Sequence, residues 1–139
     1  MRYLFIVFIF LSINLKSQSN KYKLQGCENP KGKEMKNICN SSLNQLISHY
    51  FEKYIKKYGQ RIPEGETNLV YTITKNGNIT DITYSDFKNE KFAKFAIIII
   101  NDIKRDLEKY DIRLNPIIDK ISNEPIDFEM KTPLKLYYN

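Results

Sequence analysis

Apolar residues recur at helical spacing in the segment that follows Asn40 and Ser41. Either of these two residues can cap a helix, and Gly59 stands where a helix C-cap is expected. We therefore predict a first helix over about residues 42–58. Its apolar stripe consists of Leu43, Leu46, Ile47, Tyr50, Phe51, Tyr54, Ile55 and Tyr58.

A second amphipathic segment begins at Asn89 or Glu90 and extends to about Lys109. Within it, the block 97–100 is apolar nearly all round the helix. We expect this second helix to be the most buried element, and it could be contacted on two sides. Its stripe consists of Phe92, Phe95, Ala96, Ile99, Ile103 and Leu107.

Two shorter stretches, 69–74 and 79–84, flank the pair Asn76-Gly77 and indicate a β-hairpin. Asn-Gly favours a two-residue type I′ turn. Residues opposed across an antiparallel pair share a face, so this turn would gather the apolar side chains on one side of the sheet. The predicted opposed pairs are Ile73 with Thr80, Tyr71 with Ile82, and Leu69 with Tyr84.

The clearest alternation in the chain runs from Ile126 to Tyr138. One parity is mainly apolar, and the other carries charged residues and Pro133, so one face should be core and the other solvent. Because proline cannot donate to a ladder, Pro133 indicates an edge strand or a bulge. The order helix, hairpin, helix, strand predicts an α+β fold in which two helices pack on one face of a small three-stranded antiparallel sheet.

The N-terminus has the order of features typical of a signal peptide. Arg2 is followed by the apolar run Tyr3–Leu15 and then by small residues on either side of Gln18. That run is shorter than the about 20 apolar residues that a membrane-spanning helix needs. We therefore predict a cleaved signal peptide over residues 1–19 and a periplasmic or secreted product. An uncleaved segment that tethers the protein to the membrane is the alternative.

Cys27 and Cys39 both lie in the region that would remain after cleavage. In an oxidising compartment, a pair this close is most simply one disulfide, worth about 3 kcal/mol by loop entropy. We expect it to tie down an irregular lead-in over residues 20–39, ahead of a domain over residues 40–139. The short stretch 24–27 looks faintly like a lipoprotein acylation box, but it lies too far beyond the apolar run.

Charge and candidate chemistry argue against several classes of function. The chain has 22 Lys and Arg residues against 16 Asp and Glu, but the two signs are interspersed, whereas nucleic-acid binders concentrate basic charge. His49 is the only histidine, and we expect it to be a partly buried packing residue rather than a catalytic or zinc-binding one. The acidic pairs Asp81 with Asp86 and Asp102 with Asp106 look like surface charge. We expect no enzyme activity, cofactor or metal.

The order of these motifs resembles the C-terminal domain of TonB. Residues 69–82 are similar to the family pattern V-x-F-x-I-x-x-x-G-x-V-x-x-I, and residues 89–96 to the start of its second helix. The later family motifs W-x-P, G-K-P-V and V-P-I-x-F have counterparts at 114–116, 123–126 and 132–136. Cys39 stands where a secreted bacterial subgroup has a cysteine. The chain departs from the family in lacking the tryptophan before Asn115 and in having Ile62-Pro63 where the family has Tyr-Pro.

The resemblance implies a module that binds an extended peptide by adding it as a strand to the sheet edge. The partner would be an outer-membrane TonB-dependent receptor or another envelope protein. A structural or self-associating protein, such as a homodimer, is the alternative, because the long spacer of a complete TonB protein is not found. Pro133, Lys131 and Lys135 could instead protect the edge from pairing. The candidate edge residues are Ile126, Asp127, Phe128, Glu129, Met130, Lys131, Thr132 and Leu134, and the candidate receptor-contact loop is Arg61, Ile62 and Pro63.

Overall fold

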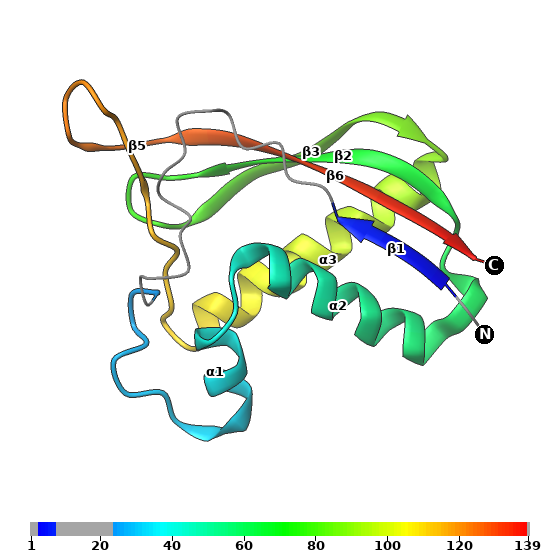
Figure 1. The fold of residues 1–139 in the computed structure, drawn as a ribbon, viewed down its shortest axis with the longest axis horizontal. Coiled ribbons are helices and arrows are strands. Elements are labelled where there is room, and N and C mark those ends of the chain that lie inside the picture. Colours follow the sequence, from blue (N-terminus) through cyan, green and yellow to red (C-terminus); the bar gives the residue numbers. More distant parts are fainter. Residues whose placement is uncertain (1–2, 8–23, 139) are drawn as a thin grey trace.

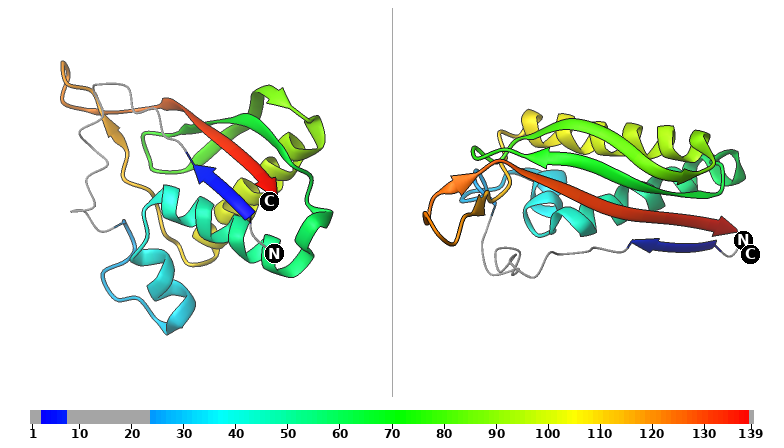
Figure 2. Two further views of the ribbon diagram at one scale, coloured as in Figure 1. Left: turned by 45° about the vertical axis from the view of Figure 1, so that its right-hand side comes forward. Right: turned by 90° about the horizontal axis from the view of Figure 1, so that it is seen from above.

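The computed structural model describes residues 3–7 and 24–138 and has the α+β class that the sequence predicts. Strands β2 (Gly65–Ile73), β3 (Ile79–Lys88) and β6 (Phe128–Tyr138) form an antiparallel sheet. Helices α2 (Leu43–Tyr58) and α3 (Glu90–Lys109) lie together on one face of that sheet (Figure 1, Figure 2). A further strand, β1 (Tyr3–Val7), extends the sheet beyond β6, so that the order is β1-β6-β2-β3.

Helix α2 (Leu43–Tyr58) has the predicted extent, but its N-cap is Ser42. The Ser42 side chain accepts from the Gln45 N–H, and the Gln45 side chain accepts from the Ser42 N–H. This reciprocal capping box satisfies two N–H groups that the helix itself cannot pair. Gly59 is the C-cap, as predicted, and a short 3₁₀ turn (Gly59–Arg61) follows.

Helix α3 (Glu90–Lys109) also matches its predicted range, with Asn89 as the N-cap. It packs against β2 and β3 on one side and against α2 on another, so it is contacted on two sides. The apolar block is not buried all round, because Ile99 and Ile100 are fully buried whereas Ile98 is 50% exposed.

The hairpin between β2 and β3 differs from the predicted type I′ turn. The Thr74 N–H donates to the Asn78 carbonyl, so the loop contains three residues, and Gly77 adopts a positive φ of 83°. A three-residue loop that ends in a left-handed glycine is the next most common hairpin connection. Ile73 consequently pairs with Ile79, one residue earlier in β3 than predicted.

Two β-bulges then change the register along β3. Asp81 and Asp86 have φ values of 52° and 49°, a left-handed conformation that aspartate tolerates better than most residues. The register shifts by one residue at each position. The first shift cancels the extra loop residue, so Leu69 does pair with Tyr84 as predicted. Both aspartates therefore lie at β-bulges, a backbone role that the interpretation as surface charge did not include.

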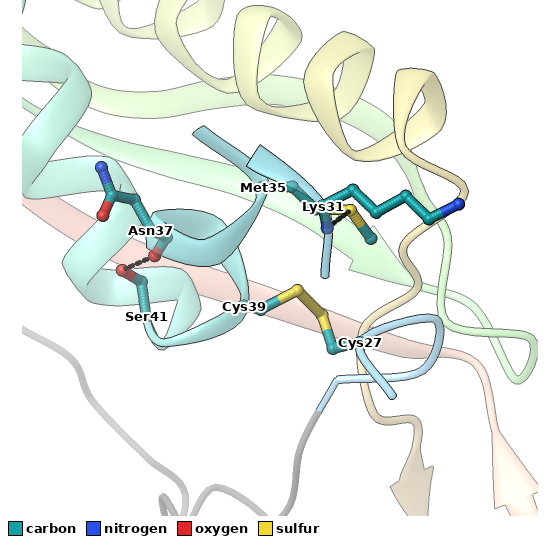
Figure 3. Close-up of a disulfide and its surroundings, with 6 residues drawn as sticks. All are labelled: Cys27, Lys31, Met35, Asn37, Cys39 and Ser41. Carbon is teal, nitrogen blue, oxygen red and sulfur yellow. Dashed lines mark hydrogen bonds between the residues drawn. A yellow bond between two sulfur atoms is a disulfide. The ribbon is translucent and has the colours of Figure 1, made fainter. Parts of the chain in front are cut away.

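The segment before α2 is only partly irregular, which corrects the prediction for residues 20–39. Residues 20–23 lie outside the described residues, and Gly32–Cys39 form a short helix, α1. The predicted disulfide between Cys27 and Cys39 is present and joins the end of α1 to the preceding loop (Figure 3). Cys27 and Ile38 are buried in the main core. The segment is therefore fastened to the domain by packing as well as by the disulfide.

The predicted strand from Ile126 to Tyr138 is divided in two. Ile126 belongs to β5 (Pro125–Ile126), which pairs with β4 (Ile117–Ile118) in a small ribbon, and β6 starts at Phe128. The carboxylate of Asp127, between the two, accepts from the Lys75 N–H at 2.7 Å. This hydrogen bond joins the start of β6 to the β2–β3 loop. Among the described residues, no helix has the length and apolar character to cross a bilayer.

Candidate strand-binding edge

Strand β6 pairs with β2 from Phe128 to Leu136 without a register shift. Pro133 lies inside this ladder, opposite Asn68. Proline has no N–H, so an unbroken ladder requires its nitrogen to face away from β2. A bulge against β2, one of the two explanations predicted for Pro133, is therefore wrong.

Successive residues of an antiparallel strand direct their N–H and C=O groups to opposite sides. Counting from Pro133, the other residues that direct these groups away from β2 are Glu129, Lys131, Lys135 and Tyr137. The Tyr138 N–H agrees with this alternation, because it donates at 2.7 Å to the carboxylate of Glu64, the residue just before β2. We call the side of β6 that faces away from β2 the outer edge.

Strand β1 covers one part of the outer edge. Tyr3–Val7 pairs antiparallel with Leu134–Tyr138, and Phe5 is opposite Leu136 at the centre. Figures 1 and 2 show β1 beside the C-terminal half of β6. None of the described strands pairs with the outer edge between Phe128 and Pro133. This pairing has no signature in the sequence, because a continuous apolar run has no period that separates strand from helix.

The loop that matches the receptor-contact motif lies at the C-terminal end of β6. The Tyr138 hydroxyl is 2.9 Å from each of the Gly59 and Ile62 carbonyl oxygens and can donate to either. Ile62 is buried, whereas Arg61 is exposed. The structure thus brings this loop next to Tyr138 at the C-terminal end of β6, whereas most of the predicted edge residues lie in the other half of the strand.

Lysine side chains beside the outer edge are partly engaged elsewhere. The ammonium of Lys135 lies 3.0 Å from the Glu66 carboxylate on β2, and that of Lys88 lies 2.9 Å from it. Hydrogen bonds from these two lysines lower the pKa of Glu66 to about 2. A shallow groove of about 290 Å³ lies along this face of the sheet, between Glu66 and Pro133. Lys135 therefore points back across the sheet, while Lys131 stays exposed.

The predicted edge residues alternate in burial within β6. Met130, Thr132 and Leu134 are buried, and the Thr132 hydroxyl lies 3.1 Å from that of Tyr71. Glu129 and Lys131 are exposed. The even-numbered positions thus contribute side chains to the core, and only the odd-numbered positions contribute backbone groups to the outer edge.

Two expectations about candidate chemistry are wrong. His49 is exposed on α2 rather than partly buried. Asp102 and Asp106 are not ordinary surface charges, because Asp102 is only 9% exposed and the two carboxylates accept from the hydroxyls of Tyr54 and Tyr50 on α2. The hydrogen bond to Asp102 raises the pKa of Tyr54 to about 12. These pairs connect α2 to α3.

The comparisons give no relative: no family model, no curated protein and no solved structure matches the chain. Within residues 3–7 and 24–138, no cluster of three or more His, Cys, Asp or Glu side chains could hold a metal ion. Most of the predicted signal peptide, 1–19, lies outside the described residues. Its residues 3–7 form β1.

Proposed function

We propose that this protein is an exported, non-enzymatic binding module that takes an extended segment of an envelope partner as an added strand on the outer edge of β6. The observation that carries the proposal is that this edge accepts β1, a strand that no tight turn connects to β6. An edge that accepts one strand of the chain has the backbone groups to accept a strand from a partner.

The position of the candidate loop supports the same region. Arg61–Pro63 is joined through Tyr138 to the end of β6, so a strand added along residues 134–138 would end close to the loop. The disulfide between Cys27 and Cys39 suits an oxidising compartment, which agrees with export. The resemblance to the TonB C-terminal domain suggests a TonB-dependent receptor as the partner.

The test is a titration of the processed chain, residues 20–139, with peptides from the N-terminal segments of outer-membrane receptors. Amide chemical shifts should change along the outer edge, chiefly at Lys135 and Tyr137. A matched pair of variants separates the backbone from the side chain. Lys135→Pro removes the outward N–H, and Lys135→Ala removes the same ion pair with Glu66 but keeps that N–H.

We expect Lys135→Pro to weaken peptide binding about 5-fold, the loss expected for one hydrogen bond of about 1 kcal/mol. Lys135→Ala should bind like the parent. Equal weakening by both variants would mean that the side chain, not the strand edge, makes the contact. The absence of any shift with every peptide would rule the function out.

Self-association is a second candidate, favoured by the part of the outer edge between Phe128 and Pro133 that no described strand covers. The same part of β6 in a second copy could pair with it. This candidate requires a mass that rises with protein concentration in sedimentation experiments. It also requires Lys131→Pro, which removes an outward N–H in this part of the edge, to restore the monomer.

A further inference from the structure

The residues that cover the outer edge also belong to the predicted signal peptide. Tyr3–Val7 forms β1 and is the first part of the apolar run Tyr3–Leu15. One segment therefore has two uses that exclude each other. Before processing it can pair with β6, and after cleavage it is no longer part of the chain.

We propose that Tyr3–Val7 acts as an intramolecular occupant that closes the outer edge in the unprocessed chain, and that removal of residues 1–19 opens it. This inference rests on the proposed function, because it names the regulation of the same edge. It also restricts the binding segment to Leu134–Tyr138, whereas the sequence pointed to Ile126–Leu134.

The pairing identifies which backbone groups are closed. Lys135 and Tyr137 direct their N–H and C=O groups outward, and their register partners are Ile6 and Leu4. Outward residues of β6 and their partners form the hydrogen-bonded pairs of an antiparallel ladder. Pro133, which has no N–H, limits this ladder on one side, and the end of the strand limits it on the other. The five residues of β1 fit this interval.

The register also indicates the kind of segment that can replace β1. Tyr3, Phe5 and Val7 are opposite Tyr138, Leu136 and Leu134. All six of these residues are apolar or aromatic. A competing ligand should therefore be an extended, antiparallel segment with apolar or aromatic residues at alternate positions.

The covalent connection makes the closed state favourable even if the segment binds weakly by itself. Because β1 and β6 belong to one chain, their pairing is intramolecular, and intramolecular pairing typically corresponds to an effective concentration of about 1 mM. Consider a free peptide with the sequence of β1 that binds the open edge with a Kd of about 100 μM. Competition from β1 in the same chain then lowers the apparent affinity for that peptide about 10-fold.

Hydrogen exchange in the full-length chain tests closure without any partner. The amides of Lys135 and Tyr137 should exchange at least about 10-fold more slowly in residues 1–139 than in residues 20–139. Two proline variants of the full-length chain are matched by register. Ile6→Pro removes an N–H that faces β6, whereas Phe5→Pro, one residue away, removes an N–H that faces outward.

We expect Ile6→Pro to restore fast exchange at Lys135 and Phe5→Pro to leave it slow. Equal exchange in the full-length and processed chains, or equal effects of the two prolines, would overturn the inference. Because this comparison is also made within the full-length chain, it does not depend on the folding of the shortened one.

A peptide arm separates this inference from the proposed function. The probe is the sequence of Tyr3–Val7 with two lysines added at each end. It should bind residues 20–139 about 10-fold more tightly than residues 1–139, and Ile6→Pro should remove the difference. Slow exchange in the full-length chain, together with no binding of receptor peptides to the processed chain, would support closure and refute the function. Receptor peptides that bind both chains equally would support the function and refute closure.

Discussion

The buried hydroxyl pair between β2 and β6 gives the sharpest test of the fold. Tyr71 and Thr132 are both fully buried, and their hydroxyl oxygens are 3.1 Å apart. Burial raises the pKa of Tyr71, so its hydroxyl stays protonated at neutral pH. We consider Tyr71→Phe, Thr132→Val and the double variant, because each change removes a hydroxyl and nearly preserves shape.

The expected energies follow from the cost of leaving a buried polar group without a partner. Thr132→Val leaves the Tyr71 hydroxyl in the core, and Tyr71→Phe leaves the Thr132 hydroxyl, each at a cost of about 1–3 kcal/mol. When both hydroxyls are removed, neither is left unpaired, and the change can be nearly neutral. The two hydroxyls should therefore be coupled by the sum of the two single losses, at least about 2 kcal/mol, with the double variant more stable than either single one.

Urea unfolding at neutral pH measures these differences, and the slope of the transition should not change among the variants. Tyr84→Phe is the control, because Tyr84 hydrogen bonds to Glu90 at an exposed position, where the loss should be within about 0.5 kcal/mol. If the double variant lost as much stability as the two single variants together, the buried pair would be refuted. That result would also refute the register that brings Tyr71 next to this part of β6.

Three further predictions test other features of the fold. Replacing Cys27 and Cys39 together by serine should lower the free energy of unfolding by about 3 kcal/mol in urea, and reduction of the parent should add two protons to its intact mass. Because the pKa of Glu66 is lowered from 4.5 to about 2, its contribution to stability is complete above pH 4.5 and is lost as the pH falls towards 2. Glu66→Gln should therefore flatten the pH profile of the unfolding midpoint in that interval. Gly77→Ala should lower the melting temperature more than Gly32→Ala does. Both glycines have a positive φ, but a Cβ at Gly77 would lie 2.1 Å from the Leu114 carbonyl oxygen, whereas a Cβ at Gly32 would meet no atom within 4 Å.

The helices could be predicted because several local signals agree for each of them. Helix α2 combines an apolar stripe, a serine cap and a terminal glycine. Helix α1 lacks this agreement: Ile38 is its one buried apolar residue, and its N-cap makes no side-chain hydrogen bond. Its position depends on the disulfide and on packing against residues distant in sequence. The two long helices are therefore predictable from apolar periodicity, and the short one is not.

The hairpin register was harder to predict because two local preferences compete. Asn76-Gly77 suits a two-residue turn, but Gly77 also suits the last position of a three-residue loop. The longer loop needs a compensating bulge, which Asp81 supplies at a positive φ. Neither feature has a strong signature in a single sequence. Leu69 and Tyr84 were still paired correctly, because the loop and the bulge change the register by equal and opposite amounts.

The candidate site was only partly predictable because strand alternation gives the faces of β6 but not the neighbours of its edges. Pro133 predicted an edge strand or a bulge; β6 lies between β1 and β2 in the sheet, but none of the described strands pairs with its outer edge at Pro133 itself. Which half of that side pairs with another strand depends on residues more than a hundred positions away, at Tyr3–Val7. Those residues carry the composition of an export signal, so the sequence favoured a different role for them.

Adjacent residues of β6 consequently serve separate purposes. Thr132, Leu134 and Leu136 are buried, so substitutions there should change stability first. The odd-numbered residues place their backbone groups at the outer edge and their side chains on the solvent face. A proline at such a position therefore removes an outward N–H and leaves the ladder with β2 intact. The natural proline at position 133 already meets this condition. The proposed binding and the stability of the fold can therefore be tested separately in one strand, by Lys135→Pro and Thr132→Val respectively.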